Sequence, residues 1–375
     1  MYRCSFLNEN EDNFGTPFKY ITQIYKAQQK GCCLARHVRQ AVIMVGGKGT
    51  RLRPLTNNCP KPILPILDKP CTEYFIDALA EAGMDEVIMA CGYRSQQVRD
   101  ALGDGSKQGI KVTYSYEDHP LGTGGALKLI QDKLDDVFIA INGDNFMDID
   151  FNKMAEEHFR SGADVTISLS TTDNPCEVGI VRLDDDGKIL EFKEKPKPEE
   201  VFSNILNTGV YVVNREVLDF VPEDTMYDFS KELFPLLMEK GRRIQGYKDP
   251  GHWMDIGRPK DFLGANILTA EKKYKGYDWS KQAKDSKISG ASYLGKGTKV
   301  KDCILESAVI SQGCKADDCK ITNSLILSGC NLDDCEIENT ILGKDCRLED
   351  CKLKDCVIAD GTVLKDAVLE NERGV

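Results

Sequence analysis

Short apolar runs alternate with amphipathic segments along the chain from residue 39 onward. Four runs are compact and rich in branched or aromatic side chains, as in buried strands: residues 41–45, 86–91, 111–116 and 137–143. Between them, residues 71–83 and 124–134 place apolar side chains at helical spacing. Alternating strands and helices predict an α/β fold, here a Rossmann-like domain with a mixed, mostly parallel sheet.

Domain boundaries follow from the same pattern. Three later runs have more hairpin character: residues 164–170, 179–184 and 208–214. We expect the α/β domain to span residues 39–270, followed by a polar linker at 271–287. Residues 1–38 are expected to form an N-terminal extension that need not be ordered. At 375 residues, the chain is long enough for two or more domains.

The C-terminal part, residues 288–370, repeats with a period of sixteen. Cysteines mark this period, since Cys303 aligns with Cys319 and Cys314 aligns with Cys330. Each period contains three pairs in which one position separates a small residue from an aliphatic residue, so each period predicts one three-sided coil. This hexapeptide pattern is typical of a left-handed parallel β-helix, here of about five coils.

Eight of the fifteen cysteines fall between Cys303 and Cys356. Stacked side chains of neighbouring coils lie about 4.8 Å apart, wider than the ~3.8 Å between the Cβ atoms of a disulfide. Parallel ladders also do not supply the convergent ligands of a metal site. We therefore expect these cysteines to be reduced thiols that act as small, buried, apolar fillers.

The net charge of -11 argues against a nucleic-acid partner. No apolar run approaches the ~20 residues that cross a bilayer, and the N-terminus lacks the basic and apolar regions of a signal peptide. The expected location is therefore cytoplasmic, without a membrane partner. An acidic protein that binds polyphosphates must concentrate cations, or recruit a metal ion, at its site.

The stretch Val45–Ile66, VGGKGTRLRPLTNNCPKPILPI, combines glycines with cations. The glycines let a ligand approach the backbone closely, and the cations indicate that this ligand is anionic. The stretch has neither the spacing of a P-loop nor that of the dinucleotide-binding glycine motif. It therefore predicts a phosphate-handling loop of another kind.

Together with the preceding strand, this stretch strongly resembles the signature of the sugar-phosphate nucleotidyltransferases, and most of all the mannose-1-phosphate guanylyltransferase branch. Further family motifs match in order: PLGTGGAL (120–127), GDN (143–145), EKP (194–196), NTGVY (207–211) and WMDIG (253–257). The resemblance covers residues 41–270 and continues through the β-helix, which many members carry. It implies that a sugar-phosphate oxygen attacks the α-phosphorus of a nucleoside triphosphate and releases pyrophosphate.

The resemblance gives the cations and glycines roles that their chemistry supports. Arg51 would bind the β- and γ-phosphates with its planar guanidinium, and Lys61 the α-phosphate in the transition state, so these two are the expected catalytic residues. Backbone N–H groups of the glycine pair would meet the nucleotide at the end of the first strand. The expected nucleotide-binding residues are Gly46, Gly47, Glu117, Gly122 and Thr123.

Two aspartates are the expected metal ligands. Asp144 follows an apolar strand, at the end where α/β sheets bind ligands, and Asp255 lies between two apolar residues. Mg²⁺ takes carboxylates together with substrate phosphates, so Mg²⁺ is the expected cofactor. By resemblance, Glu194 accepts hydrogen bonds from the sugar and Lys195 binds its phosphate. The expected sugar-phosphate-binding residues are Gly179, Glu194, Lys195 and Asn207.

Glu117 bears on the choice of base. In the family this position faces the Watson–Crick edge, and uridylyl- and thymidylyltransferases typically carry glutamine there. Guanine presents two adjacent donors, which suit an acceptor-only carboxylate. The expected substrates are therefore GTP and a hexose 1-phosphate, with mannose 1-phosphate favoured over the glucose epimer only by the family branch.

Three alternatives stay open beside a guanylyltransferase. One is a glucose-1-phosphate thymidylyl- or uridylyltransferase, and another is a non-catalytic regulatory relative, which would be expected to lose Arg51, Lys61 or Asp144. The third is a bifunctional enzyme whose β-helix transfers an acetyl group, commonly with a histidine as base. The four histidines, at 37, 119, 158 and 252, all precede the β-helix. The β-helix is instead expected to mediate homo-oligomerisation.

Overall fold

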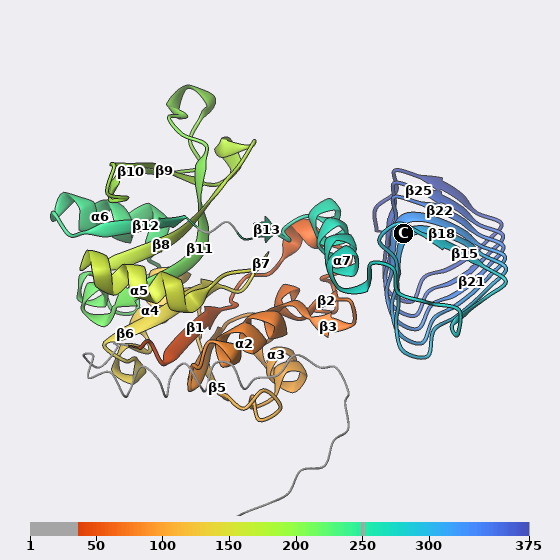
Figure 1. Cartoon of the computed structure of the whole chain (residues 1–375), viewed down its shortest axis with the longest axis horizontal. Helices are drawn as coiled ribbons and strands as arrows, with labels where there is room; N and C mark the ends of the chain where they lie inside the picture. Colours follow the sequence, from red (N-terminus) through yellow and green to blue (C-terminus); the bar gives the residue numbers. More distant parts are fainter. Residues whose placement is uncertain (1–36, 249–250, 252, 375) are drawn as a thin grey trace, which may run out of the picture. The chain divides into compact units, whose positions relative to one another are not determined.

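The computed structural model describes residues 37–248, 251 and 253–374 (Figure 1). The expected N-terminal extension lies outside these residues, apart from its last two positions. Within the described ranges, no helix combines the length and apolar character needed to cross a membrane.

A nine-stranded mixed sheet forms the centre of the α/β domain (Figure 1). Its strands are β1 (Gln40–Met44), β4 (Glu86–Cys91), β5 (Lys111–Tyr116), β6 (Val137–Asn142), β8 (Val165–Thr171), β9 (Gly179–Leu183), β10 (Ile189–Glu194), β11 (Ile205–Asn214) and β12 (Ile244–Lys248). Strands β6, β1, β4 and β5 run parallel in that order. Strand β11 pairs antiparallel with β6, β8 and β9, and so makes the sheet mixed, as predicted.

Helices cover both faces of this sheet. They are α2 (Cys71–Glu81), α3 (Ser95–Leu102), α4 (Gly122–Lys128), α5 (Phe151–Ser161) and α6 (Phe234–Glu239). Helix α7 (Pro259–Tyr274) packs instead on strands of the C-terminal part. Successive side chains of β1 point to opposite faces. Ala41 and Ile43 therefore join the core formed with α2, α3 and α5, whereas Val42 and Met44 join the core formed with α4 and α6.

The segment expected to be one helix over 124–134 differs in detail. Helix α4 begins two residues earlier, at Gly122, and ends at Lys128, and a separate 3-10 turn follows at Gln131–Lys133. Ile130 and Leu134 are both buried. Apolar side chains therefore still face the core after the backbone has changed from an α-helix to a 3-10 turn. The periodicity located the buried side chains correctly but not the end of the helix.

Parallel strands stack into a β-helix in the C-terminal part (Figure 1). One ladder contains β14 (Ala283–Lys284), β17 (Lys299–Lys301), β19 (Lys315–Asp317), β21 (Asn331–Asp333), β24 (Arg347–Glu349) and β27 (Val363–Lys365). The other faces contain β15 (Lys287–Ser289), β16 (Tyr293–Leu294), β18 (Ile304–Ile310), β20 (Lys320–Ile326), β22 (Glu336–Glu338), β23 (Ile341–Leu342), β25 (Lys352–Lys354), β26 (Val357–Ile358) and β28 (Val368–Glu370). Leu305 pairs with Ile321, and Ile321 with Ile337, which confirms the sixteen-residue coil.

Aspartate and asparagine residues turn the chain at the corners of the coils. Asp318, Asp334 and Asp350 recur once per coil with φ values of 51°, 47° and 54°. Short polar side chains tolerate this left-handed conformation better than other non-glycine residues. The first coil begins inside the stretch 271–287 expected to be a linker, and α7 crosses the boundary expected at residue 270.

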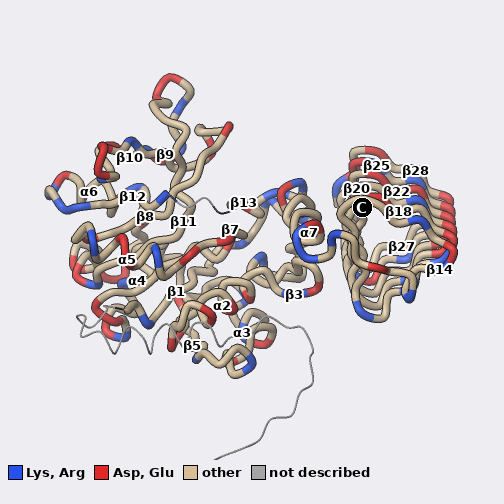
Figure 2. Tube along the Cα trace, in the orientation of Figure 1, with Lys and Arg blue, Asp and Glu red and all other residues tan. Residues whose placement is uncertain are grey.

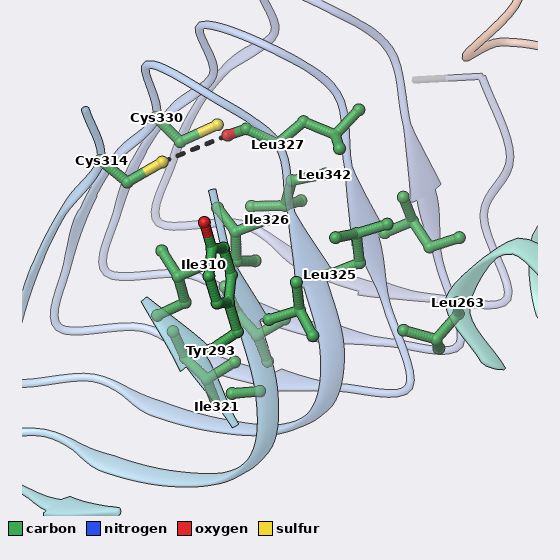
Figure 3. Close-up of a cluster of buried hydrophobic side chains, with 14 of the residues drawn as sticks. Leu263, Tyr293, Ile310, Cys314, Ile321, Leu325, Ile326, Leu327, Cys330 and Leu342 are labelled. Carbon is green, nitrogen blue, oxygen red and sulfur yellow. Dashed lines mark hydrogen bonds between the residues drawn. The ribbon is translucent and has the colours of Figure 1, made fainter. Parts of the chain in front are cut away.

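The cysteines of the β-helix are buried, as predicted. Their thiols also form hydrogen bonds, which the interpretation as apolar fillers missed. Cys314 Sγ donates to the carbonyl of Leu327 at 3.2 Å (Figure 3). Cys303 Sγ accepts the backbone N–H of Cys319 at 3.2 Å, the role that the Thr298 hydroxyl takes at another corner. The thiols thus act both as fillers and as links between coils.

Charged residues recur along the coils (Figure 2), and the paired ones have exposed side chains. Lys352 Nζ lies 3.0 Å from Glu336 one coil away, and Lys365 Nζ lies 2.6 Å from Glu349. Exposed pairs of this kind contribute about 0–1 kcal/mol each. The coils therefore depend on their buried ladders for stability rather than on these ion pairs.

One apolar cluster joins the β-helix to the α/β domain. On the α/β side it contains Leu52, Leu55, Leu64, Ile66, Ile256 and Phe262, and on the β-helix side Val309, Ile310, Leu325 and Ile326 among others. Leu263 of α7 extends toward the same cluster (Figure 3). The described residues from Val38 onward accordingly form a single compact unit. The stretch Val45–Ile66 is packed directly against this core.

Candidate active site

A cavity of about 450 Å³ opens where β1 and β6 end. Parallel strands of an open α/β sheet bind ligands at this carboxyl edge. Eight of the predicted site residues line the cavity: Gly46, Gly47, Arg51, Lys61, Glu117, Gly122, Thr123 and Asp144. The structure thus brings the predicted nucleotide-binding and catalytic residues to one place.

Lys61 is the most deeply buried cation of the cavity, with a side chain only 7% exposed. It begins a 3-10 turn between Pro60 and Pro62, whose rings restrict the backbone on both sides. Its Nζ lies 3.1 Å from Asp144 Oδ2 and 3.3 Å from Asp255 Oδ1. An ammonium buried this far from water needs such partners, because an unpaired buried charge is costly.

A short antiparallel pair brings the two aspartates together. Strand β7 (Asn145–Met147) pairs with β13 (Trp253–Asp255), and Asp255 is the direct partner of Asn145. Asp144, immediately before β7, therefore lies next to Asp255 although the two are far apart in sequence. The side chains of Asp144 and Asp255 are 52% and 36% exposed, so both remain open to a ligand.

The donor set fits a divalent cation. Carboxylate oxygens are hard ligands, and Mg²⁺ is usually held by one or two carboxylates plus substrate phosphates and water. No cluster of three or more histidine, cysteine, aspartate or glutamate side chains occurs among residues 37–248, 251 and 253–374. Asp144 in the cavity wall and Asp255, which contacts the cavity residue Lys61, would hold such a cation together with substrate oxygens.

Arg51 lies on the same side of the cavity. Its Nη2 is 3.6 Å from Asp255 Oδ2, and its side chain is 58% exposed. It belongs to the turn Thr50–Leu52, which starts from Gly49 with φ of 60°. Arg51 and Lys61 therefore face Asp255 from two directions, and both cations can reach an anion placed in the cavity.

Glu117 closes another wall of the cavity. Its Oε2 accepts the backbone N–H of Leu121 at 3.2 Å. Its Oε1 lies so near the glycine turn that a Cβ on Gly46 would be 2.8 Å away and a Cβ on Gly92 2.5 Å away. Only glycine leaves room for this carboxylate at both positions. Gly92 was not predicted as part of the site, because nothing in its sequence neighbourhood distinguishes it from an ordinary turn residue.

The PLGTGGAL motif supports a neighbouring loop. The backbone N–H groups of Gly124 and Gly125 donate to the carbonyl of Tyr227 at 2.8 and 3.1 Å. Thr123 Oγ1 accepts the backbone N–H of Phe229 at 2.8 Å. A Cβ on Gly122 would come within 2.7 Å of the Tyr227 carbonyl oxygen, so the close contact requires glycine. The motif therefore holds this loop against α4.

This contact adds two residues to the cavity wall that sequence reasoning missed, Met226 and Asp228. Met226 is 72% exposed, which is unusual for an apolar side chain and marks a surface that a ligand can cover. Both residues precede the short helical segment Phe229–Leu233. The sequence signal was weak because the loop carries no family motif of its own.

The four residues predicted to bind the sugar phosphate form a second cluster beside the cavity. Glu194 pairs directly with Gly179 across the β9–β10 hairpin, and Asn207 lies beside Gly179. Lys195 follows Glu194 with φ of 46°. Burial raises the pKa of the Glu194 carboxyl, Lys195 opposes this shift, and Asp228 adds to it. Asp228 thus connects this cluster with the cavity.

These features define a class of protein: an α/β enzyme with a carboxylate pair and two cations arranged for a phosphorylated ligand at the ends of its strands. Residues 40–272 match the Nucleotidyl transferase family, and the chain belongs to this family. The match ends two residues beyond the predicted end of the α/β domain.

Relatives include enzymes with different named substrates. The chain is 33% identical over 294 residues to "UTP--glucose-1-phosphate uridylyltransferase" of Synechocystis sp., covering 70% of this chain and 75% of that protein. It is 33% identical over 281 residues to "Mannose-1-phosphate guanylyltransferase" of Mycobacterium tuberculosis, covering 71% and 78%. The crystal structure of HddC from Yersinia pseudotuberculosis complexed with GMP-PN has a TM-score of 0.54 and 27% identity, covering 62% of this chain and 100% of that one.

Proposed function

We propose that the protein transfers a nucleotidyl group from GTP to a hexose 1-phosphate, with mannose 1-phosphate as the favoured acceptor, and releases pyrophosphate. The observation that carries this proposal is the position of Lys61, buried between Asp144 and Asp255 and next to Arg51. This arrangement suits a reaction in which several phosphate charges must approach one another. The family and the named activities of two relatives support the same reaction class.

The proposed roles of the residues combine the family resemblance with their positions around the cavity. The nucleotide would lie over Gly46 and Gly47, with its β- and γ-phosphates at Arg51 and its α-phosphate at Lys61. Each cation stabilises charge that develops as the bond to pyrophosphate breaks. Mg²⁺, held by Asp144 and Asp255, would neutralise phosphate charge and favour the in-line geometry.

The sugar phosphate would bind at the second cluster, with its phosphate at Lys195. Glu194 and Asn207 would hold its hydroxyls, and the backbone at Gly179 would add a further contact. Asp228 lines the cavity and also acts electrostatically on the Glu194 carboxyl, which supports an acceptor site at the edge of the proposed nucleotide cavity. An acceptor phosphate there can approach the α-phosphorus from the side opposite to the leaving pyrophosphate.

Glu117 supports guanine as the base. Its carboxylate lies at the cavity wall, between the glycine positions 46 and 92 and the backbone N–H of Leu121. A carboxylate can accept from both the ring N–H and the exocyclic amine of guanine, and charge-assisted hydrogen bonds contribute about 1.5–3 kcal/mol each. Glu117→Gln should lower kcat/KM for GTP by about tenfold or more and improve UTP or dTTP relative to it.

A substrate matrix tests the proposal. GTP, UTP, dTTP, ATP and CTP are each combined with the 1-phosphates of mannose, glucose and galactose in the presence of Mg²⁺, and pyrophosphate release is followed. We expect GTP with mannose 1-phosphate to give the highest kcat/KM. A preference for UTP or dTTP with glucose 1-phosphate would overturn the guanylyltransferase assignment but keep the reaction class. Turnover with none of the pairs would overturn both.

The family model ends before the β-helix. We propose that the β-helix mediates homo-oligomerisation and that the protein acts in the cytoplasm. The flanks of the β-helix are long and carry exposed apolar side chains, among them Ile304 and Val368. On the neighbouring coils, Ile304 is paired with Lys320 and Val368 with Lys352. Repeat stacks present extended surfaces that can serve for binding. Light scattering of the full chain would give the oligomeric state, and a strict monomer at micromolar concentration would contradict this part.

A further inference from the structure

The turn that carries Arg51 is held by the C-terminal end of the β-helix. The Arg373 guanidinium donates from Nε to the carbonyl of Arg53 at 2.7 Å and from Nη2 to the carbonyl of Arg51. The hydrogen bonds within the turn use other carbonyls, such as that of Gly49, which accepts the N–H of Leu52 at 3.0 Å. The carbonyls of Arg51 and Arg53 can therefore accept from Arg373. One side chain from the end of the chain thus binds two main-chain oxygens on either side of Leu52.

Arg373 is itself presented from a fixed support. It forms a parallel β-bridge with Val357 of β26. The backbone N–H of Val357 donates to the carbonyl of Glu372 at 2.8 Å, and the N–H of Gly374 donates back to Val357 O at 2.9 Å. The residues around Arg373 therefore continue the face of the β-helix that contains β23 and β26. The backbone that carries the guanidinium is fixed by this pairing.

The other end of the same stretch is held by an early coil. Asp68 lies in the turn between β2 (Pro65–Ile66) and β3 (Lys69–Pro70). Its carboxylate accepts the backbone N–H of Gln312 at 3.0 Å and the hydroxyl of Tyr293 at 3.1 Å. Because Gln312 belongs to an early coil and Arg373 to the last one, the stretch from Arg51 to Asp68 runs lengthwise along the stack.

We propose that Arg373 is a positioning residue for the nucleotide site, through which the last coil of the β-helix sets the orientation of the Arg51 turn. The Arg51 side chain is 3.6 Å from Asp255, so a small rotation of its turn moves the guanidinium relative to the carboxylate pair. Misplacement of a charged group by about 1 Å can cost up to a hundredfold in rate. The link to catalysis rests on the proposed function, whereas the contact between Arg373 and the turn does not.

Kinetics of the full chain test the positioning role. Arg373→Ala removes both donors, Arg373→Lys keeps the charge but not the two-pronged geometry, and Arg347→Ala removes an exposed arginine from β24 of the same β-helix as a matched control. With the best substrate pair of the matrix, Arg373→Ala should lower kcat/KM for the nucleoside triphosphate about tenfold. The KM for the sugar 1-phosphate should stay within about twofold, Arg373→Lys should be intermediate, and Arg347→Ala should match the wild type.

A double-mutant cycle shows whether the effect passes through Arg51. If it does, Arg373→Ala should have little further effect on kcat/KM in an Arg51→Lys background, because residues that act through one group are not additive. Full additivity, or equal losses for the nucleotide and the sugar 1-phosphate, would overturn the positioning role.

Hydrogen exchange gives a readout that needs no activity. The amides of Leu52, Arg53 and Leu55, which close the turn, should exchange faster in Arg373→Ala and unchanged in Arg347→Ala. Unchanged exchange in Arg373→Ala would overturn the contact itself. If the wild type turns over no substrate pair, the proposed function fails, and the exchange comparison still decides whether Arg373 holds the turn.

Discussion

In the proposed mechanism, Lys61 combines a packing role with a chemical one. Its aliphatic stem is buried while its ammonium contacts Asp144 and Asp255, so three charges are already paired before any ligand binds. A triphosphate with a divalent cation would redistribute these pairs, since the cation can take the carboxylates and free the ammonium for phosphate. The flanking prolines keep Lys61 in place during that exchange.

Lys61→Ala and Asp144→Ala should therefore each lower kcat by about a hundredfold or more, comparable to the loss of one preorganised electrostatic group. Steady-state pyrophosphate release measures this, with Lys111→Ala on the exposed end of β5 as a control. Thermal unfolding of each variant separates lost chemistry from lost folding. Wild-type turnover in either site variant would remove that residue from the mechanism.

Under the proposed function, Glu194 should make sugar 1-phosphate binding depend on pH. Burial raises the pKa of its carboxyl from the ordinary value of 4.5. The ionised form accepts hydrogen bonds from sugar hydroxyls more strongly than the protonated form, so the KM for the sugar 1-phosphate should rise as the pH falls through the raised pKa. Glu194→Gln should raise this KM about tenfold at neutral pH and remove the part of its pH dependence that exceeds the titration of the substrate phosphate. A parallel pH profile in both proteins would contradict the role.

The same shift has a consequence for stability. Between the unfolded and the raised folded pKa, the folded state binds more protons, so this group makes the free energy of unfolding fall as the pH rises through that window. At neutral pH the ionised Glu194 is buried at a cost. Glu194→Gln should therefore raise the midpoint of thermal unfolding at neutral pH more than at pH of about 4, as calorimetry at the two pH values would show.

At the scale of elements, the sequence predicted the strands better than the helices. Strands β4 and β5 match the expected ranges residue by residue. Strand β4 is a buried apolar run, as expected. Strand β5 lies at the edge of the sheet with only Val112 buried, and its aromatic and β-branched side chains account for its prediction as a strand. Helices α3 and α5 were not expected, because their sequences contain more polar than apolar residues. Each buries only one face, which packs on the sheet. The β-helix was predictable because its repeat is long and regular.

The hydrogen bonds of the cysteine ladder could not be predicted from that repeat. They lead to an expectation for Cys303, whose Sγ accepts the buried N–H of Cys319. Cys303→Ser keeps an acceptor and should change the free energy of unfolding little, because Ser286 already fills this role for Cys303 one coil earlier. Cys303→Ala leaves the N–H unpaired and should cost about 1–3 kcal/mol. Equal losses in the two variants, measured by urea denaturation, would show that volume alone matters.

At the scale of the whole molecule, the parts of the site that the sequence missed are those created by contacts between distant segments. Family motifs located Lys61 and Asp255, but Met226 enters the cavity only because Tyr227 packs on α4. Arg373 reaches the Arg51 turn only because the stretch from Arg51 to Asp68 packs along the coil stack as far as the last coil. A sequence pattern shows local spacing, whereas these positions depend on how the chain closes on itself.

The shared core predicts how the molecule unfolds. Leu52 and Ile256, the neighbours of Arg51 and Asp255, belong to the same buried cluster as the β-helix interior, so the catalytic stretch cannot lose its packing while the coils stay intact. Repeat stacks otherwise tend to unfold in stages from their ends.

We expect urea to unfold the full chain in one transition, with coincident midpoints from pyrophosphate release, intrinsic fluorescence and far-ultraviolet circular dichroism. Weakening the cluster with Leu52→Ala should shift all three midpoints together, by about 2–5 kcal/mol in the free energy of unfolding. Loss of activity at a urea concentration where the β-sheet dichroism is still native would instead show that the two parts are independently stable, and that the common core does not couple them.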